Sequence, residues 1–163
     1  MRILTLATIA LGAIITAVPA AAETTAASGD ARVLNPINFS LLLELDFGSV
    51  VSTPVGGTIL LDPGSGNRDC STGGLVCTGV YSVARLILTG SDAMVTVTYA
   101  PTLQLTGPGD PMTVTPLFPG GSGSQVPLTG GTATFDFGAA LTVNPGQAAG
   151  VYTGTFSVNV EYN

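Results

Sequence analysis

The chain has 163 residues, 45% of them hydrophobic, and four arginines against ten carboxylates give it a formal net charge of −6. It contains no lysine, histidine or tryptophan. Nucleic-acid binding needs clustered cations that displace counterions, so this composition excludes nucleic acid as a partner. Abundant glycine, threonine and valine, together with few strong helix formers, predict an all-β protein.

The first 22 residues read as a secretory signal peptide. Arg2 precedes the apolar run 3–18, and three alanines at 20–22 form a small-residue cleavage site before Glu23. No later run of about 18 apolar residues follows, so the mature chain is predicted to have no membrane span. We expect an exported protein, located in the periplasm, at the cell surface or outside the cell. Residues 23–30 are predicted to be a flexible leader, and residues 31–163 a single β domain.

The domain begins with two apolar alternations. Residues 31–39 place Val33, Ile37 and Phe39 on one parity, and Pro36 between them indicates an edge strand or a bulge. Residues 41–47 alternate leucine and phenylalanine with acidic side chains, which predicts a half-buried strand ending at Gly48.

The glycine-rich loop 63–80 contains the only two cysteines, Cys70 and Cys77. Six intervening residues do not suit a Cys-x-x-Cys metal site, and an exported chain favours oxidised cysteines. We therefore predict a disulfide between them. In the same region Asp62, Asn67 and Asp69 offer oxygen ligands and form a calcium candidate. The candidate is weak, because glycines occupy the positions where calcium loops carry acidic residues. No metal and no cofactor are predicted.

Further strands follow in the second half of the chain. Residues 81–89 are apolar on both parities except for Arg85, which predicts a central strand. The turn Gly90-Ser91-Asp92 then leads to the alternating run 94–99, and together these runs predict a hairpin. Short strands are expected at 103–105 and 112–115, and then at 132–137 and 141–143.

The longest alternation closes the chain at residues 152–162. One parity of this run holds the apolar and aromatic side chains, namely Tyr152, Phe156, Val158, Val160 and Tyr162. The other parity is polar, so a long strand with one buried face is predicted. With turn signals every eight to twelve residues, the pattern predicts an immunoglobulin-like β-sandwich of about eight to ten antiparallel strands. A small jelly roll or barrel is the alternative.

No arrangement of residues indicates an enzyme. A nucleophilic triad needs a base, and the chain has neither histidine nor lysine. A carboxylate pair drawn from Glu44, Asp46 and Asp136 resembles a glycosidase site only superficially, because acidic residues are common on the wet face of a strand. The tyrosines at 81, 99, 152 and 162 are interpreted mainly as core residues rather than as a sugar platform.

Four stretches together resemble a known family. They are residues 31–37, the LDFG motif at 45–48, residues 81–90 and the closing residues 150–162, and they are similar to domain-of-unknown-function family 4402, which comprises small secreted bacterial proteins. The resemblance covers nearly the whole mature chain. The family name implies no function.

The C-terminus also resembles chaperone–usher pilins and spore-coat-U-like subunits, because Tyr162 is penultimate and Gly150 is fourteenth from the end. The resemblance implies that these two residues form a C-terminal assembly motif. It also implies that Val33, Ile37 and Phe39 belong to a donor strand that adds to an exposed sheet edge of the next subunit. The partners would be further copies of the chain or other surface subunits, with an export chaperone.

Two hypotheses for the function follow. In the first, the protein is a non-enzymatic structural surface protein, pilin-like or adhesin-like, that assembles by strand addition. In the second, it is a self-contained secreted binding module for calcium, a glycan or a protein partner. Residues 31–39 separate the two: packed in their own domain as a full strand they favour the second hypothesis, and free beside a groove they favour the first.

Overall fold

The computed structural model describes residues 23–163 and divides the chain into two units, residues 1–32 and residues 33–163. The predicted signal peptide lies outside the described residues. Residues 23–32 contain no helix or strand and are exposed. No helix in the described part of the chain is long and apolar enough to cross a membrane.

The second unit is built almost entirely of strands, with one short 3-10 helix, η1 (Thr72–Gly74). The strands are β1 (Asn38–Leu43), β2 (Ser49–Val51), β3 (Gly57–Leu61), β4 (Arg68–Asp69), β5 (Val76–Thr78), β6 (Ala84–Thr89), β7 (Met94–Tyr99), β8 (Leu103–Leu105), β9 (Met112–Leu117), β10 (Ser124–Pro127), β11 (Thr132–Val143) and β12 (Val158–Tyr162).

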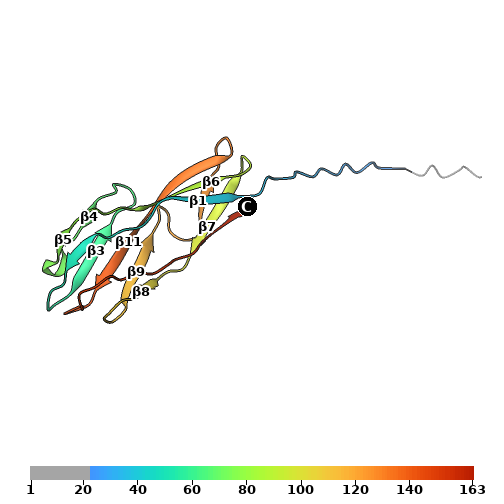
Figure 1. Cartoon of the computed structure of the whole chain (residues 1–163). Coiled ribbons are helices and arrows are strands. Elements are labelled where there is room, and N and C mark those ends of the chain that lie inside the picture. The colour runs from blue at the N-terminus through green and yellow to red at the C-terminus, as the bar shows by residue number, and fades with distance from the viewer. Residues whose placement is uncertain (1–22) are drawn as a thin grey trace, which may run out of the picture. The chain divides into compact units, whose positions relative to one another are not determined.

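Two antiparallel sheets and a small ribbon make up the fold. The large sheet runs in the order β1-β6-β11-β3-β4, with β9 also paired to β11 and β8 paired to β9. The second sheet has the order β10-β7-β12, and β2 pairs with β5 in the ribbon. Figure 1 shows the ribbon region near one end of the domain and the C-terminus at the other. The predicted antiparallel all-β sandwich is confirmed.

The long strand β11 holds the large sheet together. Its first half pairs with β6, and its second half pairs with β3 on one edge and β9 on the other. Two separate strands were predicted here, with a break near Gly138. The break is absent because the glycine lets the chain pass close to β3, where a Cβ atom would collide with the Leu61 carbonyl oxygen.

The predicted hairpin of residues 81–89 and 94–99 is wrong. β6 pairs with β1 and β11, whereas β7 pairs with β10 and β12 in the other sheet. The turn at Gly90-Ser91-Asp92 therefore carries the chain across the sandwich. Both strands still bury their apolar faces, since Leu88 and Val95 pack into one cluster between the sheets.

The core consists of three clusters, and Phe137 on β11 lies in the middle one. Its ring is fully buried, with centroids of the Phe118, Tyr99, Phe135 and Phe156 rings at 4.8, 5.1, 5.8 and 5.8 Å. Edge-to-face and stacked pairs at these separations are favourable aromatic contacts. Phe137 thus packs the large sheet against aromatic side chains from other parts of the chain, including Tyr99 on β7.

The single charge in β6 has a partner on the adjacent strand. Arg85 Nε and Nη2 donate to the two carboxylate oxygens of Asp136 at 2.7 and 2.8 Å, on a face open to solvent. These hydrogen bonds lower the pKa of Asp136 below its ordinary value of 3.8, although partial burial opposes the shift. The one charged side chain in the central strand predicted for residues 81–89 thus has a partner on the neighbouring strand.

This pair makes stability weakly dependent on acid. Because the folded-state pKa of Asp136 is depressed, its contribution is present above the unfolded pKa and is lost as pH falls through the folded pKa. For a solvent-screened pair we expect about 1 kcal/mol or less. Urea unfolding of Asp136→Asn at pH 7 and at pH 3 should show a smaller acid-induced loss than wild type. Asp30→Asn, in the leader, controls for the changed net charge; an unaltered acid dependence in Asp136→Asn would contradict the assignment.

The C-terminal strand is shorter than predicted. Regular pairing covers Val158–Tyr162 against β7, and before it only Thr153 makes a bridge, to Thr106. β7 ends at Tyr99, so the residues before Val158 have no strand to pair with on that side. The predicted alternation of burial is still observed, with the apolar parity half-buried from Tyr152 to Tyr162 and the polar parity exposed.

The N-terminal strand also differs from the prediction. One strand, β1, spans the end of the first predicted run and the start of the second, and residues 33–37 lie in no strand. Pro36 explains the boundary, since proline lacks the N–H that a ladder requires. Within residues 23–163 β1 pairs only with β6, so it is an edge strand there.

Candidate functional site

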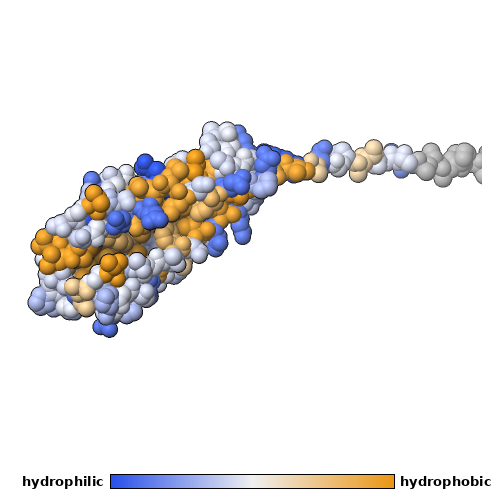
Figure 2. Space-filling view, in the orientation of Figure 1, coloured by the Kyte–Doolittle hydropathy of each residue, from blue (hydrophilic) through white to orange (hydrophobic). Residues whose placement is uncertain are grey.

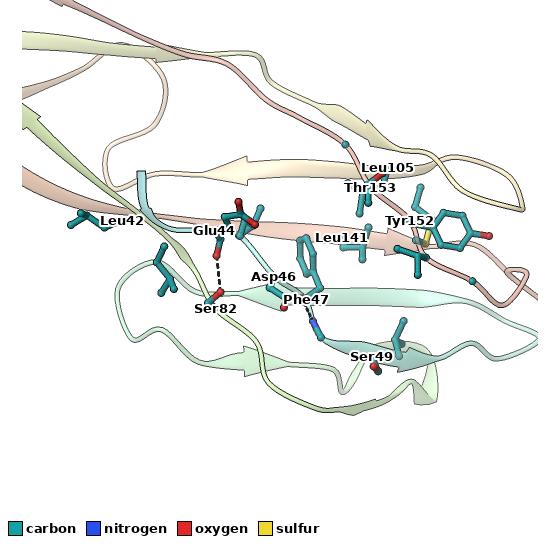
Figure 3. A pocket seen from close by; sticks show the side chains of 18 residues that line it. Leu42, Glu44, Asp46, Phe47, Ser49, Ser82, Leu105, Leu141, Tyr152 and Thr153 are labelled. Carbon is teal, nitrogen blue, oxygen red and sulfur yellow. Dashed lines mark hydrogen bonds between the residues drawn. The ribbon is translucent and has the colours of Figure 1, made fainter. Parts of the chain in front are cut away.

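An open groove of about 860 Å³ lies between two chain segments that do not pair with each other. One wall is residues 42–50, from the end of β1 to the start of β2, and the other is residues 150–154, which lead toward β12. Leu105, Met112 and Leu141 on β8, β9 and β11 also line the groove. Figure 3 shows the Leu141 side chain between Phe47 on the first wall and Tyr152 on the second.

The middle of the first wall, residues 44–46, is hydrogen-bonded to Ser82. Asp46 and Ser82 exchange two backbone hydrogen bonds of 2.9 Å, and the Ser82 hydroxyl donates to the Glu44 carbonyl oxygen at 2.6 Å (Figure 3). Successive residues of an extended chain point their backbone groups to opposite sides. The backbone groups of Leu45 and Phe47 therefore point away from Ser82. In the described structure the Leu45 backbone has no hydrogen-bond partner.

The second wall has the same arrangement. Thr153 and Thr106 exchange backbone hydrogen bonds of 2.8 and 3.0 Å. The backbone groups of Tyr152 and Gly154 must then point away from β8, and within residues 23–163 neither backbone makes a hydrogen bond. Both walls of the groove thus carry backbone groups that an inserted extended chain could bind.

The opening continues beyond the groove along β1. Phe39 and Leu41 are directly opposite Leu88 and Leu86, so they lie on the face that β6 buries in the core. They nevertheless remain 42% and 53% exposed. Figure 2 shows apolar residues gathered over β1 and along the visible face toward the ribbon end. The inner face of the large sheet is therefore uncovered at this edge.

The second sheet has a matching free edge. β12 pairs with β7, and no other strand in the described part of the chain pairs with β12. We expect a strand added beside β12 to lie over the exposed face of β1 and to run into the groove. The sandwich therefore lacks cover along one side, bounded by β1 with residues 42–50 and by residues 150–162.

The disulfide lies next to the end of the first wall. Cys70 and Cys77 are joined, as predicted, and Cys77 on β5 is paired with Val50 on β2. Residues 49 and 50, the end of the first wall, belong to β2. The disulfide thus anchors β5, the strand to which the end of the first wall is hydrogen-bonded.

Replacing both cysteines by serine is expected to lower the free energy of unfolding by roughly 2–3 kcal/mol, from the entropy of closing a short loop. Urea unfolding would measure this, and wild type treated with dithiothreitol should approach the same midpoint. Dithiothreitol should leave the double variant unchanged. An identical urea midpoint for wild type and variant would show that the crosslink does not stabilise the ribbon.

The structure distributes the predicted donor residues over different environments. Val33 is 93% exposed, Ile37 is half-buried against the cluster of Leu88, Val95 and Leu128, and Phe39 belongs to β1. The segment neither packs as a full strand nor lies wholly outside the domain. Its role as a donor stays a prediction.

The two residues of the predicted assembly motif lie at opposite ends of the C-terminal segment. Gly150, with a φ of +152°, lines the groove beside Pro108, in a conformation that favours glycine. Tyr162 ends β12, where its hydroxyl accepts from Ser91 N at 2.6 Å and donates to the Asn35 carbonyl oxygen at 2.9 Å. Neither contact shows assembly by itself.

The carboxylates of the weak calcium candidate accept hydrogen bonds from the backbone of their own turns. Asp62 Oδ1 accepts from the backbone of Gly64 and Ser65 at 2.7 and 3.2 Å, and Asp69 Oδ1 accepts from Ser71 N at 2.8 Å. The hydrogen bonds from Ser71 lower the pKa of Asp69 below its ordinary value. Among the described residues no group of three acidic, cysteine or histidine side chains is placed to hold a metal ion.

The tyrosines are dispersed rather than gathered into a platform. Tyr99 packs edge-on to Phe137, and Tyr152 donates its hydroxyl proton to the Ala148 carbonyl oxygen at 2.9 Å. Arg68 lies over the Tyr81 ring at 4.4 Å and also donates to the Phe47 carbonyl oxygen at 2.9 Å. Arg68 thereby ties the end of the first wall to the chain after β5.

Sequence reasoning missed the groove. Residues 41–47 were predicted as an ordinary half-buried strand, and the second wall was absorbed into the predicted C-terminal strand. One signal was present: Leu41, Leu42 and Leu43 are apolar on both parities, which is unusual for a strand with one wet face. That run indicates a segment with neighbours expected on both sides.

Fold and groove together define a class: an antiparallel β-sandwich that is open along one side. The family model described as Domain of unknown function (DUF4402) matches residues 37–162. The chain belongs to this family. No characterised protein and no solved structure matches the chain significantly.

Proposed function

We propose that the protein is a non-enzymatic, exported surface subunit, pilin-like or adhesin-like, that assembles by strand addition into the open side of its sandwich. The observation that carries the proposal is the pair of facing walls, on which Leu45, Tyr152 and Gly154 present backbone groups with no partner in the described structure. An added β-strand supplies hydrogen bonds to exactly such edges and side chains to the apolar floor between them.

The N-terminal segment of another copy is the proposed donor. The second unit begins at Val33, whose side chain is 93% exposed. Export is supported by the signal-peptide pattern of residues 1–22 and by the disulfide, which persists in oxidising compartments.

An export chaperone is a further expected partner. Before assembly the open side exposes Phe39 and Leu41 together with unpaired backbone, and such edges aggregate readily. A chaperone that lends a strand to the groove would cover these groups until the next subunit replaces it.

Amide hydrogen exchange tests strand addition without assuming the donor. In assembled protein the N–H groups of Leu45, Tyr152 and Gly154 should exchange slowly, and in monomer they should exchange fast. Asp46 and Thr153, whose N–H groups already make bonds of 2.9 and 3.0 Å, are internal controls expected to be slow in both states. Fast exchange at the groove amides in both states would contradict the proposal and favour the alternative, a self-contained binding module for calcium, a glycan or a protein partner.

A further inference from the structure

Tyr162 holds the N-terminal segment at one residue. Its hydroxyl donates to the Asn35 carbonyl oxygen at 2.9 Å and accepts from Ser91 N at 2.6 Å. The Asn35 backbone N–H donates in turn to Ser91 Oγ at 2.7 Å. We call this set of contacts among Tyr162, Ser91 and Asn35 the tyrosine clamp. It joins the end of β12, the crossing turn after β6 and the start of the second unit.

The residues that follow the clamp pack in the domain of the copy to which they belong. Pro36 cannot donate to a β ladder, and Ile37 packs on the third core cluster beside Leu88 and Val95. β1 begins at the next residue and pairs with β6. A donated strand that included Ile37 or Phe39 would have to abandon these contacts.

The residues before the clamp show a pattern suited to donation. From Thr25 to Val33 one parity is uncharged throughout and mostly small, comprising Thr25, Ala27, Gly29, Ala31 and Val33. The charged residues Asp30 and Arg32 lie on the other parity. All of residues 23–33 are exposed, and none lies in a strand. Nine extended residues span about 30 Å, and the first wall of the groove is also nine residues long, 42–50.

We infer that residues 25–33 of a second copy are the strand that fills the groove, with the uncharged parity facing inward, and that the tyrosine clamp marks where donation ends. This inference rests on the proposed function and names the occupant of its groove. Inserted in this register, the strand keeps Asp30 and Arg32 in water, and Ile37 remains in the domain from which it comes.

Matched alanines test the register. Ala27→Asp and Ala31→Asp would bury a charge in the groove, so we expect SDS-resistant oligomers to fall at least tenfold. Ala26→Asp places the same charge on the outward parity and should leave oligomers within about twofold of wild type. All three positions are exposed in the free chain, so monomer unfolding should be unchanged. Equal effects on both parities would overturn the register.

Ile37→Asp tests the boundary set by the clamp. Because Ile37 packs in its own domain, the substitution should lower the Tm of the monomer. If it abolished oligomers while the monomer Tm stayed unchanged, the donor would extend past the clamp and the inference would be wrong.

Trypsin gives a readout independent of mutation. Arg32 is exposed in the monomer, so cleavage after it should remove the leader, whereas in oligomers the inserted strand should resist cleavage for at least ten times longer. Equal cleavage rates in the two states would overturn the inference. If wild type forms no oligomers and the groove amides stay fast, the proposed function itself fails, which is distinguishable from oligomers that tolerate charge at Ala27 and Ala31.

Discussion

Replacing Phe137 with alanine is expected to lower the free energy of unfolding of the monomer by about 3–5 kcal/mol. The ring is fully buried on β11 and contacts four other aromatic rings, which come from β7, β11, the residue after β9 and the segment before β12. Truncation removes the apolar surface of the ring and leaves a cavity that these rings cannot collapse to fill. Urea denaturation followed by circular dichroism would measure the loss.

Phe39→Ala is the matched control, because Phe39 is 42% exposed on the edge strand β1. In the monomer its truncation should cost about 1 kcal/mol or less, since much of the ring already contacts water. Similar losses for the two variants would show that Phe137 is not the centre of the core.

Leu41→Asp is expected to reduce assembly by about 100-fold or more while leaving the monomer folded. Leu41 is 53% exposed on the uncovered inner face of the large sheet, so its charge is hydrated in the monomer. A strand added beside β12 would cover this position and bury an unpaired carboxylate, which costs several kcal/mol, and each 1.4 kcal/mol is a factor of ten. The concentration at which oligomers form, measured by light scattering, would report the change.

Val80→Asp supplies the control for this variant. Val80 is 84% exposed and lies outside the two walls, so the same charge should leave assembly unchanged. Far-UV circular dichroism and the Tm of the monomer establish that each variant is folded. If Leu41→Asp assembled like wild type, the uncovered face of β1 would not be part of the subunit contact.

Local sequence patterns predicted where the strands lie better than they predicted which strands pair. Alternation placed β7 and the first half of β11 because a period of two depends only on which face is buried. It does not specify the partner strand, so the turn at Gly90 read as a hairpin although the chain crosses to the other sheet there. The continuity of β11 through Gly138 depends on the close approach of β3, which sequence spacing cannot show.

The candidate site was predictable only in part. The cysteine pair followed from its spacing and the expected export, since both are local properties. The groove depends instead on which strand lies next to residues 42–50 and 150–154, where the backbones of Leu45, Tyr152 and Gly154 have no partner in the described structure. The Leu41-Leu42-Leu43 run, apolar on both parities, was the one signal that this segment lacks a neighbour on one side. The tyrosine clamp joins residues 127 positions apart, beyond the reach of any periodicity.

The most direct test of strand addition is an SDS gel of the native protein taken from the cell surface, run with and without boiling. Subunits that share β-sheets should resist the detergent, so we expect a ladder without boiling and a single band after it. A single monomer band in both lanes would contradict assembly by strand addition.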